Sequence, residues 1–102
     1  MPRRTNAFQK LVAQIERALH GSGATVEESA MIRDFQSDTD IEVDVLITFD
    51  KGGRAYRTAI ECRAHRRPQS KAWIRELAQK RDDCRLDCIV AASESGFSKP
   101  AR

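Results

Sequence analysis

Apolar residues recur along this chain with two different periods, and the first period is helical. Over residues 7–20 the apolar positions fall on one helical face, and Gly21 and Gly23 end the pattern. Glycine is common just after the last turn of a helix. The segment therefore predicts an amphipathic helix whose core-facing stripe consists of Phe8, Leu11, Val12, Ile15 and Leu19.

The second period is that of a β-strand, and it begins after a polar loop over residues 34–40. Residues 41–49 alternate strictly, and the segment 50–53, with its glycines, predicts a tight turn into a return strand over 54–63. A stretch over 24–32 favours one more strand before the loop. In the alternating segment, one face is expected to carry Ile41, Val43, Val45, Ile47 and Phe49.

The last third of the chain predicts a helix followed by a strand. Pro68 suits the first turn of a helix over residues 69–82. The nearly continuous apolar run over 86–92 is typical of a buried strand that is reached by a helical crossover. We expect the charged side chains of this helix to face solvent: Lys71, Arg75, Glu76, Lys80 and Arg81.

The order of elements is therefore helix, three strands, helix, strand. Three antiparallel strands would lead through the crossover to a fourth, parallel strand. This order predicts a single α+β domain over residues 1–102, with a central four-stranded mixed sheet and a helix on each face.

Pairing across the hairpin decides which polar side chains meet. A two-residue or a four-residue loop gives the same parity of pairing. Either loop places the apolar residues of the first strand on one face of the sheet. The other face then carries Asp44, Ala59, Glu61 and Arg63.

Asp44 and Glu61 offer two carboxylates from neighbouring strands, about 4.5–8 Å apart as direct or diagonal neighbours. With the backbone carbonyl of Cys62 between them, they can share a hard cation such as Mg²⁺. Arg63 points to the same face and can donate two hydrogen bonds to a phosphate. The same three side chains can also form a salt-bridge cluster with no ligand, and the pattern alone leaves both interpretations open.

Composition changes this picture only slightly. The chain has 102 residues, enough for one modest core, and its net charge of +3 suits a polyanionic partner without requiring one. No apolar run is long enough to cross a bilayer, and no apolar signal core follows the basic N-terminus. We therefore expect a cytoplasmic protein with no membrane partner. The odd number of cysteines, three, predicts free thiols.

Four short motifs resemble those of the PD-(D/E)XK nuclease superfamily, in its Mrr-like restriction endonuclease branch. They occur in the family's order and cover nearly the whole chain. Their counterparts here are Val43-Asp44-Val45, Glu61-Cys62-Arg63, Arg66-Arg67-Pro68 and Ser95-Gly96-Phe97-Ser98. The resemblance implies a restriction endonuclease-like αβββαβ core.

The resemblance also implies a metal-dependent deoxyribonuclease, a hydrolase that cuts phosphodiester bonds in DNA. Asp44, Glu61 and the carbonyl of Cys62 would bind Mg²⁺ or Mn²⁺, and Arg63 stands where the family has its lysine. Double-strand cutting by so small a domain would favour a homodimer. Contacts with nucleic acid would come from a basic cluster: Arg63, His65, Arg66, Arg67 and Lys71.

Three departures from the family pattern favour an alternative. Arg63 stays protonated, so it can stabilise negative charge but cannot act as a base. Gln9 stands where the family often has a glutamate, and Glu16, two turns further on, is the expected substitute. The chain also ends soon after Phe97, before the family's usual final helix and strand. The alternative is a catalytically inactive nuclease-fold module that binds nucleic acid or a protein partner.

Overall fold

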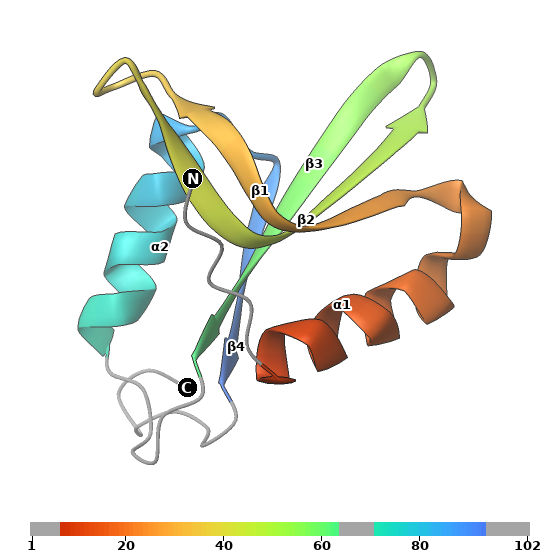
Figure 1. Ribbon diagram of the computed structural model, residues 1–102. Helices are drawn as coiled ribbons and strands as arrows, with labels where there is room; N and C mark the ends of the chain where they lie inside the picture. Colours follow the sequence, from red (N-terminus) through yellow and green to blue (C-terminus); the bar gives the residue numbers. More distant parts are fainter. Residues whose placement is uncertain (1–6, 64–70, 94–102) are drawn as a thin grey trace.

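The computed structural model describes residues 7–63 and 71–93, and its elements follow the expected order (Figure 1). α1 spans Ala7–His20, and one 3₁₀ turn, η1, follows over Gly21–Gly23. The remaining elements are β1 (Thr25–Asp34), β2 (Thr39–Lys51), β3 (Arg54–Arg63), α2 (Lys71–Asp83) and β4 (Cys88–Ser93).

The strands form one four-stranded mixed sheet in the order β1-β2-β3-β4. β1, β2 and β3 pair antiparallel, and β4 pairs with β3 in parallel. α1 covers one face, where Ala13 packs on Ile60. The opposite face packs against α2 and the turn that follows it, where Cys84 joins the core (Figure 1). The predicted α+β class, with a four-stranded mixed sheet and helices, is confirmed. Neither of the described helices is long and apolar enough to span a membrane.

The turn between β2 and β3 is a two-residue loop made of Gly52 and Gly53. Both have positive φ, +62° and +80°, which side chains other than glycine rarely adopt. Lys51 pairs with Arg54 directly beside the loop, and the register continues to the pair of Val45 with Ile60. The predicted parity of the hairpin is therefore confirmed.

The strict alternation of β2 fails near Asp44, so the prediction of one continuous apolar face was wrong. Val43 belongs to the core on the α2 side, and Ile41 packs against that core. Val45 and Ile47 belong to the core on the α1 side.

The physical reason for this change of face lies partly on the neighbouring strand. Ser29 of β1 has a φ of 51°, the left-handed conformation that interrupts regular strand geometry. It lies between Glu28, which pairs with Val45, and Ala30, which pairs with Val43. The apolar side chains of both strands therefore switch from one face of the sheet to the other at the same position along the paired strands. As a result, β2 contributes apolar side chains to both cores.

α1 packs through a different stripe from the one expected. Gln9 and Ala13 are buried, whereas Leu11, Ile15 and Leu19 are 51%, 48% and 72% exposed. The small side chain of Ala13 lets the helix approach the sheet closely. The amide of Gln9 tolerates burial because it donates to Ser29 Oγ over 3.0 Å.

Candidate active site

One pocket brings together two of the predicted site residues and one unexpected lysine. Asp44 from β2, Glu61 from β3 and Lys80 from α2 line a hollow of about 260 Å³ with Glu42. The register of the hairpin places the two acids on the side of the sheet that faces α2. The predicted juxtaposition of Asp44 and Glu61 is thus present in the structure.

Asp44 holds β2 and β3 together where their regular pairing ends. The ladder between the two strands stops at Val45 and Ile60. Beyond this point the backbone N–H of Cys62, two residues after Ile60, donates to Asp44 Oδ2 over 2.7 Å. A carboxylate is a strong acceptor for such a bond. The side chain of Asp44 therefore replaces the next backbone contact and is fixed beside Glu61.

Lys80 is the main functional candidate that sequence reasoning missed. Its Nζ donates to Glu61 Oε1 over 3.0 Å and to the carbonyl oxygen of Glu42 over 3.1 Å. The side chains of Lys80 and Glu61 are only 21% and 14% exposed. The expectation that Lys80 faces solvent was wrong.

A signal for this placement exists in the spacing of α2. Trp73 and Leu77 are the buried residues of the helix, and Lys80 follows them by seven and three positions. Residues so spaced share one helical face. The long apolar stem of Lys80 can cross the buried face of the helix while its ammonium group reaches a carboxylate.

Burial and charge perturb the acid–base behaviour of this pocket. Burial raises the pKa of Glu61 above its ordinary 4.5, the charge of Lys80 partly opposes this, and the charge of Asp44 adds to it. Burial, helped by the two carboxylates, also raises the pKa of the Cys62 thiol to about 12. Cys62 is therefore a neutral thiol near pH 7, which excludes a thiolate role for its side chain.

Arg63 lies on the same side of β3 but contacts a different partner. Its guanidinium stacks over the ring of Trp73, 4.9 Å from the centroid. Among the described residues it forms no ion pair with Asp44 or Glu61, and Lys80 occupies that position. The expected three-residue cluster thus contains Lys80 in place of Arg63.

The two α1 candidates have different surroundings. Gln9 reaches Ser29, whose neighbours in β1 pair with Val45 and Val43, the residues on either side of Asp44. Glu16 instead pairs with His20 over 3.2 Å along the helix and does not line the carboxylate pocket. Gln9 thus supports the strand beside Asp44 from the α1 side.

Of the predicted basic cluster, the structure describes only Arg63 and one other residue. Lys71 is exposed at the start of α2. His65, Arg66 and Arg67 lie outside the described residues, as does the motif over residues 95–98.

The pocket offers enough oxygen ligands for a magnesium ion that takes one or two ligands from the protein. It does not offer enough for a metal ion whose ligands all come from the protein. Within residues 7–63 and 71–93, no group of three or more His, Cys, Asp or Glu side chains could hold a metal ion. Mg²⁺ is commonly bound through one or two carboxylates, with waters and substrate phosphates completing its shell. Asp44 and Glu61 meet this smaller requirement, since they share a pocket and their charges interact.

Comparisons with known proteins give information on the fold alone. No family model matches the sequence, and no curated protein matches it either. Among solved structures, the chain is similar to the crystal structure of AF1548, a protein of unknown function, with a TM-score of 0.67 and 15% sequence identity. The match covers 90% of this chain and 50% of that one, so this chain spans about half the length of AF1548.

Proposed function

We propose that this protein is a metal-dependent nuclease of the PD-(D/E)XK type that hydrolyses phosphodiester bonds in DNA. The observation that carries the proposal is the position of Lys80 Nζ, 3.0 Å from Glu61 Oε1 in the pocket that Asp44 also lines. The pocket combines two acids and a lysine, the residue types of the nuclease motif, although the lysine comes from α2 rather than from β3.

Asp44 and Glu61 would hold Mg²⁺ or Mn²⁺, which when bound polarises the phosphate and lowers the pKa of a coordinated water. The backbone N–H of Cys62 orients Asp44 for this task. Lys80 is placed to stabilise negative charge that develops on the phosphate. Unlike an arginine, it can also exchange a proton with the attacking water. Arg63, held over Trp73, would contact a neighbouring phosphate.

Cleavage of supercoiled plasmid DNA with Mg²⁺ or Mn²⁺ tests this proposal. We expect nicking by the wild-type chain and a loss of at least about 100-fold in Asp44→Asn, Glu61→Gln and Lys80→Met. Glu76→Gln, which changes an exposed acid of α2, is the matched control and should cut normally. Undiminished cutting by Asp44→Asn and Glu61→Gln would reject this site.

A second candidate function is an inactive nuclease-fold module that binds nucleic acid or a protein partner. It is supported by the internal partners of both acids: Asp44 Oδ2 accepts from Cys62, and Glu61 Oε1 accepts from Lys80. Such pairs can neutralise the pocket without a cation. Titration with Mn²⁺ separates the two functions, because binding that disappears in Glu61→Gln favours the enzyme and the absence of binding at millimolar Mn²⁺ favours the module.

A further inference from the structure

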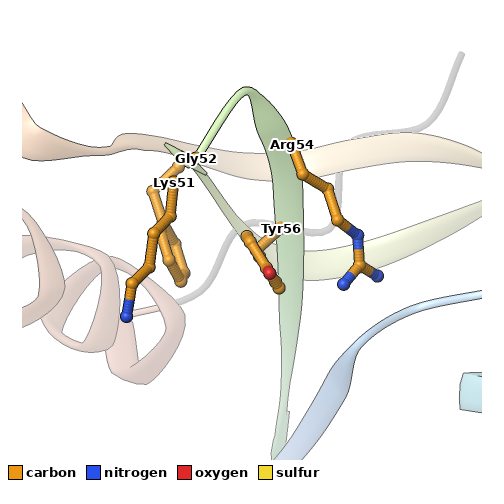
Figure 2. Close-up of a pocket in the computed structure, with 5 residues that line it drawn as sticks. Lys51, Gly52, Arg54 and Tyr56 are labelled. Atoms are coloured by element: carbon orange, nitrogen blue, oxygen red, sulfur yellow. The ribbon is translucent and has the colours of Figure 1, made fainter.

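The tip of the β2–β3 hairpin gathers aromatic rings and cations on one face (Figure 2). Phe49 pairs with Tyr56, and Lys51 pairs with Arg54, so all four side chains project to the same side. Together with Gly52 they line an open hollow of about 600 Å³, within the range of ligand sites. By the alternation of the strand, the acidic Asp50 points to the opposite face.

The two rings form a stacked pair rather than separate surface residues. The centroids of Phe49 and Tyr56 are 5.4 Å apart, with 15° between the ring planes. The guanidinium of Arg54 lies 4.3 Å from the centroid of Tyr56. Figure 2 shows Lys51 and Arg54 on opposite sides of Tyr56. The tip thus presents a stacked ring pair with one cation over Tyr56 and a second cation on the other side of that ring.

Arg54 is held in this position by an acid from another element. Its Nη2 donates to Asp87 Oδ1 over 2.6 Å, and Asp87 Oδ2 accepts from the backbone N–H of Arg57 over 2.8 Å. A guanidinium carries five N–H donors, so binding Asp87 through one nitrogen does not use all of them. Arg54 is therefore pre-organised, and little side-chain entropy is lost when it meets an anion.

We propose that this tip binds single-stranded nucleic acid, with a base stacked against the ring pair and the flanking phosphates held by Lys51 and Arg54. Stacking surfaces next to cations are the means by which proteins bind unpaired strands without reading their sequence. An acidic peptide would engage the cations but would leave the rings without a flat partner. The inference rests on the proposed function in one respect, that the substrate is a nucleic acid. It narrows that substrate to nucleic acids that contain an unpaired segment.

The tip is separate from the carboxylate pocket, so the two can be tested independently. Glu61 lies seven positions after Arg54 along β3, which is roughly 23 Å at about 3.3 Å of rise per residue. The tip also lies on the α1 side of the sheet, whereas the pocket faces α2. Binding at the tip should therefore need neither metal nor an intact pocket.

Fluorescence anisotropy with a fluorescein-labelled single-stranded DNA of about 20 nucleotides, in EDTA, is the direct test. For Lys51→Ala we expect weaker binding and a salt slope that falls by about 0.7, because one phosphate contact is lost. For Phe49→Leu we expect binding weaker by about fivefold or more with an unchanged slope, because stacking is lost and charge is kept. Arg75→Ala, an exposed cation of α2, should bind as the wild type does.

Each alternative has its own outcome. Equal binding by wild type, Lys51→Ala and Phe49→Leu would overturn the proposal, as would tighter binding to a duplex of the same sequence. Displacement of the DNA by polyglutamate with equal ease from wild type and Phe49→Leu would also overturn it. If Phe49→Leu does not fold, photo-crosslinking of bromouracil-containing DNA to wild type decides: a crosslink to Phe49 or Tyr56 supports the proposal, and crosslinks confined to other residues reject it.

Failure of this inference can be told from failure of the proposed function. Glu61→Gln should bind the oligonucleotide as tightly as the wild type, whether or not the protein cuts DNA. If no cleavage is found but Phe49→Leu weakens binding, the tip site stands and the nuclease proposal falls. If cleavage depends on Asp44 and Glu61 but both tip variants bind normally, the tip inference falls by itself.

Discussion

Strand β3 contributes one residue to each of two acid–cation pairs, which are similar in distance but differ in their surroundings. Lys80 and Glu61 are 3.0 Å apart in a pocket where their side chains are 21% and 14% exposed. Arg54 and Asp87 are closer, at 2.6 Å, but their side chains are 62% and 27% exposed. Exposed pairs contribute little because water screens them, whereas a shielded charge depends on its partner. Burial, rather than distance, therefore determines how much each pair matters.

This difference follows from where each pair lies in the fold. The pocket lies under α2, which supplies Lys80, and the side chain of Glu61 within it is largely buried. The turn of the hairpin projects away from both helices (Figure 1). The pocket suits chemistry that needs desolvated charge, and the tip suits a contact that must remain accessible.

The largest expected effect comes from Ser29, where β1 and β2 change face. Its φ of 51° is a strained conformation for a β-branched residue, and its Oγ accepts from the buried Gln9. We expect Ser29→Val to lower the free energy of unfolding by about 2–4 kcal/mol, from backbone strain plus the lost hydrogen bond. Urea unfolding followed by the fluorescence of the single tryptophan, Trp73, measures this.

Ser29→Gly is the matched control for this prediction. Glycine adopts positive φ freely, so only the hydrogen bond is lost, and a cost of about 1 kcal/mol is expected. Equal costs for valine and glycine would show that backbone conformation at Ser29 does not set the change of face.

Much of the fold could be predicted from the sequence, because periodicity and turn chemistry act locally. The parity of the hairpin pairing followed from a short glycine turn, although two registers of that parity stayed open, and the parallel β4 followed from the helical crossover. The changes of face could not be predicted this way. They depend on the backbone of Ser29 and on the close approach of Ala13, which are tertiary effects that override a regular pattern.

The candidate site was predictable in its acids but not in its cation. Asp44 and Glu61 meet because strand pairing has a fixed parity. The spacing of Lys80 from Trp73 and Leu77 is a signal for its placement. Glu76 and Arg81 lie three and four positions from the same two residues, respectively, so spacing alone did not rank Lys80 first. Arg63 was assigned to the pocket from its position two residues after Glu61, but the ring of Trp73 offered it another partner.

The second effect in size is a pH-dependent loss of stability in Lys80→Met. Without Lys80, burial and Asp44 raise the pKa of Glu61 still further above 4.5. At pH 4 the carboxyl group is largely protonated with or without the lysine, so the cost should be small. At pH 8 the variant must bury a charge without its partner, and we expect a loss of about 1–3 kcal/mol. Urea unfolding at both pH values measures the difference.

The sign follows from proton binding. Since Glu61 binds its proton more tightly in the folded chain than in the unfolded one, its contribution to stability falls as pH rises from 4.5 through the folded pKa. Removal of Lys80 raises the pKa of Glu61 in the folded chain further, so the pH range over which stability is lost extends to higher pH. Lys71→Met, which changes an exposed lysine of the same helix, should show no such pH dependence. A cost for Lys80→Met that is the same at pH 4 and pH 8 would contradict the pairing with Glu61.

The smallest expected effect is at the tip, in Arg54→Gln. Because Arg54 is exposed and its partner Asp87 also accepts from the backbone of Arg57, loss of the guanidinium should move the urea midpoint by only a small fraction of the shift in Lys80→Met. That small shift should vanish at 1 M salt, where the screening length is about 3 Å. A double-mutant cycle with Asp87→Asn isolates the pair. If its coupling equalled that of Lys80 with Glu61, exposure would not be what distinguishes the two regions, and Arg54 would have a structural role that conflicts with its assignment as an accessible anion contact.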